Sequence, residues 1–427
     1  MMKLVIIGGG FGGLRLARAL SNKAGISITL IDRFNYHQFQ PLFYQVASAG
    51  LDASNISFPL RKVFHESENV RFCMATVTKI EHSQNKITTD IGEFDYDQLV
   101  IATGADTNFF GNELMQANAM PMKSTVEAIE LRHRMLSNFE DATATHNKAE
   151  KDRLMHVVVV GGGPTGVELS GAIADMRRFM LPKDYPELDF AQMKITLLEG
   201  SPKLLASMSP KSSEQAQQYL EQLGVLVHTN TILKSYDGNV ATLQDGSTIN
   251  TALVIWAAGI KGNVLPGIDN ALIARGNRIK INNQCLVNGF SNVYAIGDVA
   301  YMDTDVAYPN GHPQVAPVAI QQADMLVNNL LLINSKSNND RMQVFEYNDK
   351  GAMATVGRKL AVVDMPKPKL HFGGFLAWLV WMFLHLMLIV GVKNRLFVFF
   401  NWFYNYFTKD QNLRLIFKVN YKKRAVG

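Results

Sequence analysis

Two stretches of this 427-residue chain carry the pattern that binds a dinucleotide pyrophosphate. Each is a run of branched apolar residues followed by G-x-G-x-x-G, and the runs begin at Val5 and Val158. The first glycine permits a tight turn, the second lets the backbone approach the pyrophosphate, and the third lets the helix pack on the strand. The anion then binds free N–H groups at the positive end of the helix. The motif residues are Gly8, Gly10, Phe11, Gly12 and Gly13 in the first copy, and Gly161, Gly163, Pro164, Thr165 and Gly166 in the second.

A carboxylate at the end of the next strand should bind the adenosine ribose. Asp32 ends such a run in the first copy, and Glu199 ends the corresponding run in the second. Glu199 comes later than the usual spacing because of an insertion from 177 to 192. An acid here would repel a 2′-phosphate, so the sequence favours NADH over NADPH. Two dinucleotides on one chain indicate a flavin that takes electrons from a nicotinamide.

The order of these motifs predicts an α/β fold with two Rossmann-like dinucleotide-binding domains and a C-terminal amphipathic, membrane-anchoring helical segment. A weaker repeat, Ala102-Thr103-Gly104 and Ala257-Ala258-Gly259, supports a duplicated domain. We expect the first nucleotide domain at 1–115, the second at 116–270, a return to the first at 271–335 and the anchoring region at 336–427. Locally, we expect helices near 124–140 and 316–333, polar segments at 141–153 and 335–340, and strands near 343–347, 352–356 and 360–364.

Composition narrows the chemistry. The two cysteines, Cys73 and Cys285, are far apart in the sequence, which argues against a disulfide framework, a metal cluster or a CxxC redox pair. We therefore expect no metal site. The chain enters a strand at Lys3 without a charged leader and cleavage site, so we expect no signal peptide.

The C-terminal region combines positive charge with apolar runs. From Lys367 onward there are ten Lys or Arg and one acid, which gives +9 there and −4 in the rest of the chain. The run 370–392 has no Asp, Glu, Lys or Arg, and the run 396–407 is strongly aromatic. Such runs with basic flanks are typical of a lipid surface, whereas a nucleic-acid site is disfavoured because the basic residues are interleaved with them.

The length of the first run would permit a membrane span. A single span, however, would carry the basic C-terminus away from the side of the catalytic body, against the positive-inside tendency. We therefore favour two helices lying in the bilayer interface, with lipid contact through residues 370–424. A buried dimer interface is the alternative, and both could coexist.

Several segments occur together in this chain: the GGGFGG opening, FQPLFYQVA at 39–47, GVEL at 166–169, YAIGD at 294–298, and KNRL and FNW within the tail. In these segments the sequence resembles the type II NADH:quinone oxidoreductases, which are single-subunit, non-proton-pumping respiratory NADH dehydrogenases with two dinucleotide-binding domains. The similarity extends over the whole chain, and the segment at 39–47 and the tail are its most specific parts.

This resemblance implies FAD, tightly but non-covalently bound, in the first domain and NADH in the second. Asp298 would bind the ribityl or pyrophosphate region of FAD. The further cofactor-binding residues that it implies are Arg33, Gln45, Ala102, Thr103, Gly104, Ala258, Gly259 and Gly297.

The resemblance also implies catalytic positions. Glu168 matches an acid near the nicotinamide–flavin contact, although stabilisation of the first turn of a helix is an alternative role. Gln321 matches the second glutamine of a pair that meets quinone at the flavin, and Pro317 replaces the first, which puts the polar part of that pocket in doubt. The other quinone-binding candidates are Gln45, Ala319, Gln322 and Lys359.

The implied reaction passes a hydride from NADH to FAD and two electrons to a membrane quinone, without proton pumping. The implied setting is a homodimer, peripheral on the cytoplasmic side of the cell inner membrane. Two alternatives stay open at this point. One is a related NAD(P)H flavoprotein of the ferroptosis-suppressor or apoptosis-factor type, and the other is a non-enzymatic, flavin-stabilised membrane scaffold.

Overall fold

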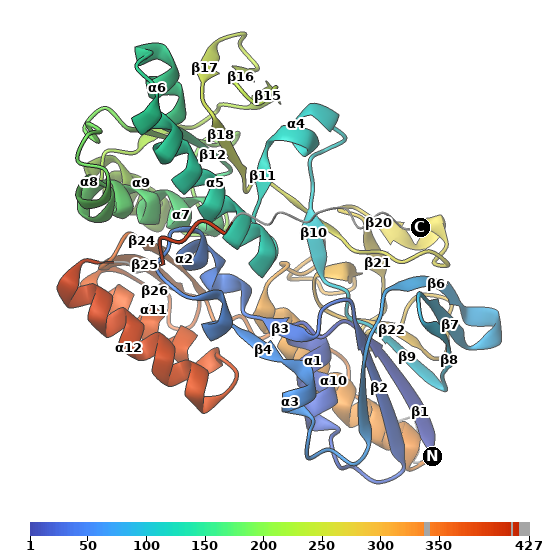
Figure 1. The fold of residues 1–427 in the computed structure, drawn as a ribbon. Coiled ribbons are helices and arrows are strands. Elements are labelled where there is room, and N and C mark those ends of the chain that lie inside the picture. The colour runs from blue at the N-terminus through green and yellow to red at the C-terminus, as the bar shows by residue number, and fades with distance from the viewer. Residues whose placement is uncertain (337–341, 411–412, 418–427) are drawn as a thin grey trace, which may run out of the picture. The chain divides into compact units, whose positions relative to one another are not determined.

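The computed structural model describes residues 1–336, 342–410 and 413–417, which form two compact units (Figure 1). Unit 1 comprises Met1–Gln38, Ser57–Asn108 and Ile260–Lys350. Unit 2 comprises Phe39–Ile56, Phe109–Gly259 and Gly351–Gly427, less the residues outside the description.

The centre of unit 1 is a five-stranded parallel sheet in the order β22-β9-β1-β2-β5. Its interior strands are near-continuous apolar runs because side chains on both faces are buried, as the successive residues Val5 and Ile6 are. The helices α1 (Phe11–Ala19) and α10 (Ala316–Asn334) pack side by side (Figure 1). The strands are β1 (Met2–Ile7), β2 (Ile26–Asp32), β5 (Val70–Met74), β9 (Gln98–Ile101) and β22 (Val293–Ala295).

Smaller elements complete unit 1. An antiparallel meander, β6-β7-β8, lies between β5 and β9 in the chain, and β10, which follows β9, pairs with β19. Since β10 and β19 are neighbours, the chain leaves unit 1 and re-enters it on adjacent strands. These elements are β3 (Tyr36–Gln38), β4 (Ser57–Pro59), α3 (Leu60–Val63), β6 (Val77–Glu81), β7 (Lys86–Thr89), β8 (Gly92–Asp95), β10 (Ala105–Thr107), β19 (Ile260–Gly262), β20 (Ile273–Ala274), β21 (Arg278–Lys280) and β23 (Ala300–Tyr301).

Unit 2 repeats the arrangement with the strand order β11-β18-β12-β13-β14. The helix α7 (Pro164–Asp175) follows β12 as α1 follows β1, and β12 lies between its partners as β1 does. The predicted duplication of a Rossmann-like domain is therefore confirmed. The strands are β11 (Met120–Pro121), β12 (His156–Val160), β13 (Lys194–Leu198), β14 (Leu226–His228) and β18 (Leu253–Trp256).

One local prediction in unit 2 is confirmed, and one polar segment proves to contain a helix. The helix expected near 124–140 is α5 (Thr125–Ala144), and the polar segment at 141–153 contains a second helix, α6 (Lys148–Leu154). Asn147 caps α6, since its side chain accepts hydrogen bonds from the N–H groups of Ala149 and Glu150. Part of this polar segment is therefore a capped surface helix.

The other elements of this part of unit 2 include a short helix within the FQPLFYQVA segment. This helix, α2, packs against α5 and α7, so Phe39–Ile56 lies in unit 2 although the range 1–115 included it in the first domain. The insertion holds a π-helical turn at Met176–Met180 and α8. The elements are α2 (Phe43–Ala47), α4 (Glu113–Asn118), α8 (Leu181–Asp184), α9 (Pro210–Gln222), β15 (Leu233–Tyr236), β16 (Val240–Leu243) and β17 (Thr248–Asn250).

The C-terminal part of unit 2 is an antiparallel sheet followed by two helices (Figure 1). The strands expected near 352–356 and 360–364 are confirmed, but 343–347 forms no strand. The first five residues of the apolar run 370–392 form β26, since they pair with β25. The elements are β24 (Ala352–Val356), β25 (Leu360–Met365), β26 (Leu370–Gly374), α11 (Phe375–Leu388) and α12 (Val392–Thr408).

The two C-terminal helices each bury one narrow stripe. In α11 this stripe contains Ala377 and Trp381, and in α12 it contains Val398 and Trp402, both at helical i, i+4 spacing. No helix in the described ranges has both the length and the apolar character needed to cross a membrane. Residues 337–340 of the expected polar linker, and 411–412 and 418–424 of the expected lipid-binding segment, lie outside the described residues.

Candidate functional site

The backbone of the first glycine loop is packed so closely that two of its positions leave no room for a side chain. Gly8 has a φ of 107°, and a Cβ on Gly13 would overlap the carbonyl oxygen of Gly8, so both positions require glycine. The loop is fixed from the side by Asp32, whose Oδ2 accepts a hydrogen bond from the Gly9 N–H at 2.6 Å. Gly10 caps α1 and contributes no side-chain hydrogen bond, and the N-terminus of a helix favours an anion.

Asp32 is held in a well-defined position at the end of β2. Its Oδ1 accepts a hydrogen bond from the Phe34 N–H at 2.7 Å. Burial raises the pKa of Asp32, and the hydrogen bonds from Phe34 and Gly9 oppose that rise. Arg33 extends over the ring of Phe34, 5.0 Å from its centroid, so its guanidinium is already engaged.

The second loop has the same construction. Gly161 has a φ of 109°, and a Cβ on Gly166 would overlap the carbonyl oxygen of Gly161. Glu199 follows β13 directly, and its Oε2 accepts a hydrogen bond from the Gly162 N–H at 2.5 Å. The insertion therefore delays Glu199 in the sequence without changing its place in the fold. Pro164 begins α7, where its missing N–H and fixed φ suit the first turn.

The predicted residues after β9 and β18 lie beside these loops. A Cβ on Gly8 would overlap the carbonyl oxygen of Ala102, and a Cβ on Gly161 would lie 2.7 Å from the Cα of Ala258. Thr103 donates through its hydroxyl to the carbonyl oxygen of Asn263 at 2.6 Å, and the N–H of Asn263 donates to the carbonyl oxygen of Gly104. Gly259 follows Ala258 directly and precedes β19.

Unit 1 also gathers residues from α1, β22 and α10. A Cβ on Gly12 would lie 3.1 Å from Ile296, and a Cβ on Gly297 would lie 3.1 Å from the Cβ of Ala319. The N–H of Gly297 donates to Oε1 of the buried Gln322 at 2.7 Å. Gln322 and Ala319 therefore serve the packing of this turn. The adjacent Asp298 is tied to Gln314, which donates to the Asp298 carbonyl oxygen at 2.9 Å.

The position of Pro317 at the start of α10 explains why a proline can replace the first glutamine of the pair. This residue is the second of the helix, where proline costs no intrahelical hydrogen bond. Gln321 lies one turn further along, half-buried, with its side-chain amide paired to the backbone of Asn348. It accepts from the Asn348 N–H at 2.9 Å and donates to the Asn348 carbonyl oxygen at 3.0 Å.

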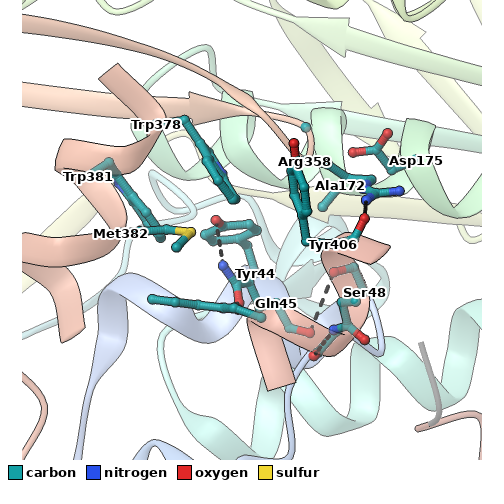
Figure 2. Close-up of a pocket in the computed structure, with 14 residues that line it drawn as sticks. Tyr44, Gln45, Ser48, Ala172, Asp175, Arg358, Trp378, Trp381, Met382 and Tyr406 are labelled. Atoms are coloured by element: carbon teal, nitrogen blue, oxygen red, sulfur yellow. Dashed lines mark hydrogen bonds between the residues drawn. The ribbon is translucent and has the colours of Figure 1, made fainter. Parts of the chain in front are cut away.

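Unit 2 contains a pocket of about 600 Å³, including its open mouth, against α11 and α12 (Figure 2). Gln45 lies at this pocket, and so does Asp175, which sequence reasoning did not select. Lys359 is exposed and does not line it. The lining residues are Tyr44, Gln45, Ser48, Gly50, Ala172, Asp175, Gly357, Arg358, Trp378, Trp381, Met382, Trp402, Asn405 and Tyr406.

Glu168 is a buried carboxyl in the same unit. It is the fifth residue of α7 and lies beyond the first turn, so the alternative role in first-turn stabilisation is not supported. Burial raises the pKa of Glu168 to about 8, and the Thr355 N–H, which donates to its Oε1 at 3.3 Å, opposes that rise. The Trp381 indole also favours the ionised form, although its N–H does not meet hydrogen-bond geometry.

Asp175 is the second perturbed carboxyl of α7. It is 7% exposed, and burial raises its pKa to about 7 against the opposing charge of Arg358. Seven positions separate it from Glu168, which places both on one helix face. This i, i+7 spacing of two acids was the available sequence signal. Perturbed carboxyls beside a pocket are typical of functional sites.

Two family patterns match the chain. The family described as "Pyridine nucleotide-disulphide oxidoreductase" matches residues 2–323, and the "NDH2 C-terminal domain" matches residues 350–409. Together they account for both glycine loops and for the C-terminal sheet and helices.

Curated relatives cover most of the chain. The type II NADH:quinone oxidoreductase NdhA of Mycobacterium tuberculosis is 35% identical over 415 residues, which are 94% of this chain and 86% of that protein. The Ndh protein of the same organism is 33% identical over 94% of this chain and 87% of its own length. The type II NADH:quinone oxidoreductase of Staphylococcus aureus is 29% identical over 83% of this chain and 87% of its own length.

Solved structures share the fold. NDH2 from Plasmodium falciparum, solved in complex with NADH, has a TM-score of 0.88 at 22% identity and covers 98% of this chain and 100% of its own. The sulfide:quinone oxidoreductase of Aquifex aeolicus has a TM-score of 0.70 at 19% identity and covers 92% of each chain.

Proposed function

The chain belongs to the type II NADH:quinone oxidoreductases, and from this premise we propose how its residues divide the work. It is a flavoprotein enzyme that oxidises NADH and reduces a quinone. This membership replaces both the scaffold alternative and the related NAD(P)H flavoprotein alternative. The proposal concerns the identity of the flavin, the residues of each site and the cellular setting.

The flavin is FAD, bound at the first glycine loop, and NADH binds at the second. The observation that carries this assignment is the shared construction of the loops. In each, a strand-end acid accepts a hydrogen bond from the second glycine of the GGG triplet, and a positive-φ glycine faces an obligatory glycine on the helix. A dinucleotide with a pyrophosphate and an adenosine ribose fits each cradle. Bound FAD would supply the two-electron redox chemistry that links NADH oxidation to quinone reduction.

The protein positions these groups. Gly8, Gly10, Phe11, Gly12 and Gly13 hold the FAD pyrophosphate against the N-terminus of α1, and Asp32 holds its ribose. Gly161, Gly163, Pro164, Thr165 and Gly166 do the same for NADH, with Glu199 on the ribose. The supporting turns contain Arg33, Ala102, Thr103, Gly104, Ala258, Gly259, Gly297 and Asp298. Glu168 acts near the nicotinamide–flavin contact, where its buried carboxyl holds a proton at neutral pH.

Quinone contact is assigned to Gln321, with Gln45, Ala319, Gln322 and Lys359 as further candidates. The partial exposure of Gln321 supports the first assignment, because a ligand can reach its side chain, and its bonds to Asn348 fix the orientation of the amide. Gln322 is the weakest candidate, since it is 2% exposed and already paired with Gly297.

The C-terminal helices dock on a lipid surface. The face of α12 opposite its buried stripe presents Phe400, Phe403 and Phe407, which are 61%, 57% and 66% exposed. Lys393, at the start of α12, lies near this face with its Nζ 5.4 Å from the ring centroid of Phe397, which suits anionic headgroups. We place the protein peripherally on the cytoplasmic side of the cell inner membrane, as a homodimer.

Anaerobic flavin absorption tests the assignment. The purified, detergent-extracted protein receives NADH, a parallel sample receives NADPH, and a short-chain quinone follows. We expect NADH to bleach the flavin much faster than NADPH does, and the quinone to restore the absorption. Extraction of a flavin other than FAD would overturn the cofactor assignment, and equal rates with NADPH would overturn the role of Glu199.

A further inference from the structure

A chain of hydrogen bonds within unit 2 joins the C-terminal helix α12 to the buried carboxyl of Glu168. The indole N–H of Trp402 donates to Oε1 of Gln45 at 2.7 Å. Nε2 of Gln45 then donates to the hydroxyl of Tyr44 at 2.9 Å, as Figure 2 shows. The Tyr44 hydroxyl is 3.0 Å from Oγ1 of Thr355, and the N–H of Thr355 donates to Glu168. Elements far apart in sequence therefore meet at one carboxyl.

The indole of Trp402 fixes the orientation of the Gln45 side-chain amide. An indole N–H can only donate, so the Gln45 oxygen must face Trp402 and the Gln45 amide nitrogen must face Tyr44. The Tyr44 oxygen accepts that bond, and it lies 3.0 Å from Oγ1 of Thr355, where either hydroxyl can donate. The orientation of the Gln45 amide is therefore fixed from both of its ends.

Burial makes this arrangement consequential. Tyr44, Thr355, Glu168 and Trp402 are between 1% and 8% exposed. Hydrogen bonds are stronger in such surroundings, and a buried group left without its partner is costly. Loss of the Trp402 donor would therefore disturb Gln45 and Tyr44 in turn, and with them the strand segment that carries the Thr355 N–H.

Other ionisable groups act mainly away from Glu168. Arg358, Arg178 and Lys359 act on Asp175, at the other end of α7. From α2, Tyr44 stays protonated because burial and the charge of Glu168 raise its pKa. From α11, the indole of Trp381 faces Glu168 and is stacked on His385, whose pKa burial lowers to about 4. Among the described neighbours, the Thr355 N–H is the largest influence opposing the effect of burial on the pKa of Glu168.

We propose that Trp402, Gln45 and Tyr44 are positioning residues that hold the Thr355 N–H against Glu168 and so link the proton affinity of this carboxyl to the seating of α12. The proposal rests on the proposed function only for the catalytic importance of Glu168. The link itself can be measured in the oxidised holoenzyme, without turnover.

The test follows the protonated carboxyl band of Glu168 by infrared difference spectroscopy from pH 5 to pH 10, with Glu168→Gln identifying the band. Trp402→Phe and Tyr44→Phe each remove one donor and keep an aromatic ring. We expect each to move the titration midpoint upward by about 0.5–1 pH unit, because the bond that favours the carboxylate is weakened. We expect the double variant to match Tyr44→Phe, since the two changes break one chain.

Matched controls distinguish the loss of a hydrogen bond in this chain from a change in the packing of the pocket. Trp378→Phe and Tyr406→Phe remove an indole N–H and a hydroxyl from the same pocket but outside the chain, and they should leave the midpoint unchanged. Gln45→Met provides a second break in the chain if Tyr44→Phe loses its flavin. Equal midpoints in the wild type and Trp402→Phe, or equal shifts in the controls, would overturn the proposal. Normal flavin bleaching by NADH alongside such a result would leave the proposed function intact.

Discussion

The carboxylate of Glu199 accepts a hydrogen bond from the backbone N–H of Gly162 at 2.5 Å. Its second oxygen accepts from the N–H of Ser201 at 2.7 Å, so both oxygens are oriented by the backbone. A charge held this firmly at the end of β13 cannot move away from a ligand phosphate. The geometry of the second glycine loop therefore bears on the preference for NADH over NADPH.

Replacing Glu199 should therefore relax this choice. In Glu199→Gln the negative charge is lost, while one oxygen remains for the Gly162 N–H. We expect the ratio of kcat/KM for NADH to that for NADPH to fall by about tenfold or more. Steady-state kinetics with both nucleotides measure it, and an unchanged flavin content provides the control. An unchanged ratio would show that Glu199 does not select the nucleotide.

Alanine at the third glycine of each motif should separate the two nucleotide sites. A Cβ at Gly13 or Gly166 would overlap the backbone of its own loop. We expect Gly13→Ala to be purified without flavin, and Gly166→Ala to retain the flavin but lose its bleaching by NADH. Visible absorption and anaerobic titration distinguish the two, and each variant is the control for the other. Flavin loss confined to Gly166→Ala would reverse the assignment of the loops.

Glu168 should make stability depend on pH. Its folded pKa of about 8 lies above the ordinary value of 4.5, so the folded state binds the proton more tightly than the unfolded state. The stability linked to this proton is fully present below about pH 4.5 and is lost as pH rises to about 8. Glu168→Gln has no carboxyl here to ionise, so its free energy of unfolding should not fall in this way. At pH 9 it should exceed that of the wild type by an amount on the order of a few kcal/mol.

Thermal unfolding at pH 5 and pH 9 measures this difference. We expect similar Tm values at pH 5 and a Tm higher by a few degrees for Glu168→Gln at pH 9. Asp175 is present in both proteins, so its own titration cancels in the comparison. A Tm difference that is the same at both pH values would contradict the raised pKa.

The aromatic face of α12 should control attachment to lipid. Phe400→Ser combined with Phe403→Ser removes two exposed rings and leaves the buried stripe of Val398 and Trp402 intact. We expect flotation with anionic vesicles to fall severalfold, because burial of a large aromatic side chain contributes about 1.5–3 kcal/mol. Phe110→Ser, at a ring that is 67% exposed outside the C-terminal helices, is the control. Unchanged flotation together with a change from dimer to monomer would favour the dimer interface instead.

The sequence by itself determined the parts of this protein that depend on local sterics. A glycine with φ near 107° and a second glycine beneath it can be recognised from residue type and spacing, because a Cβ at either position is excluded. The acid after the next strand follows from the same topology, so Asp32 and Glu199 were found despite the insertion. Where local signals were ambiguous, the predictions were incomplete or wrong. The helix α6 was not distinguished within a segment recognised only as polar, and the strand β26 was included in an apolar segment expected to form a helix.

The tertiary structure alone decided which distant groups meet. Gln45 and Trp402 have no relation in sequence, yet a 2.7 Å hydrogen bond joins them. Glu168 and Asp175 are ordinary acids in the sequence, and only burial raises their pKa values. Desolvation depends on all the atoms that surround a group, and those atoms come from segments brought together by packing. The glycine loops could therefore be predicted from the sequence, whereas the surroundings of the two carboxyls depend on the tertiary packing.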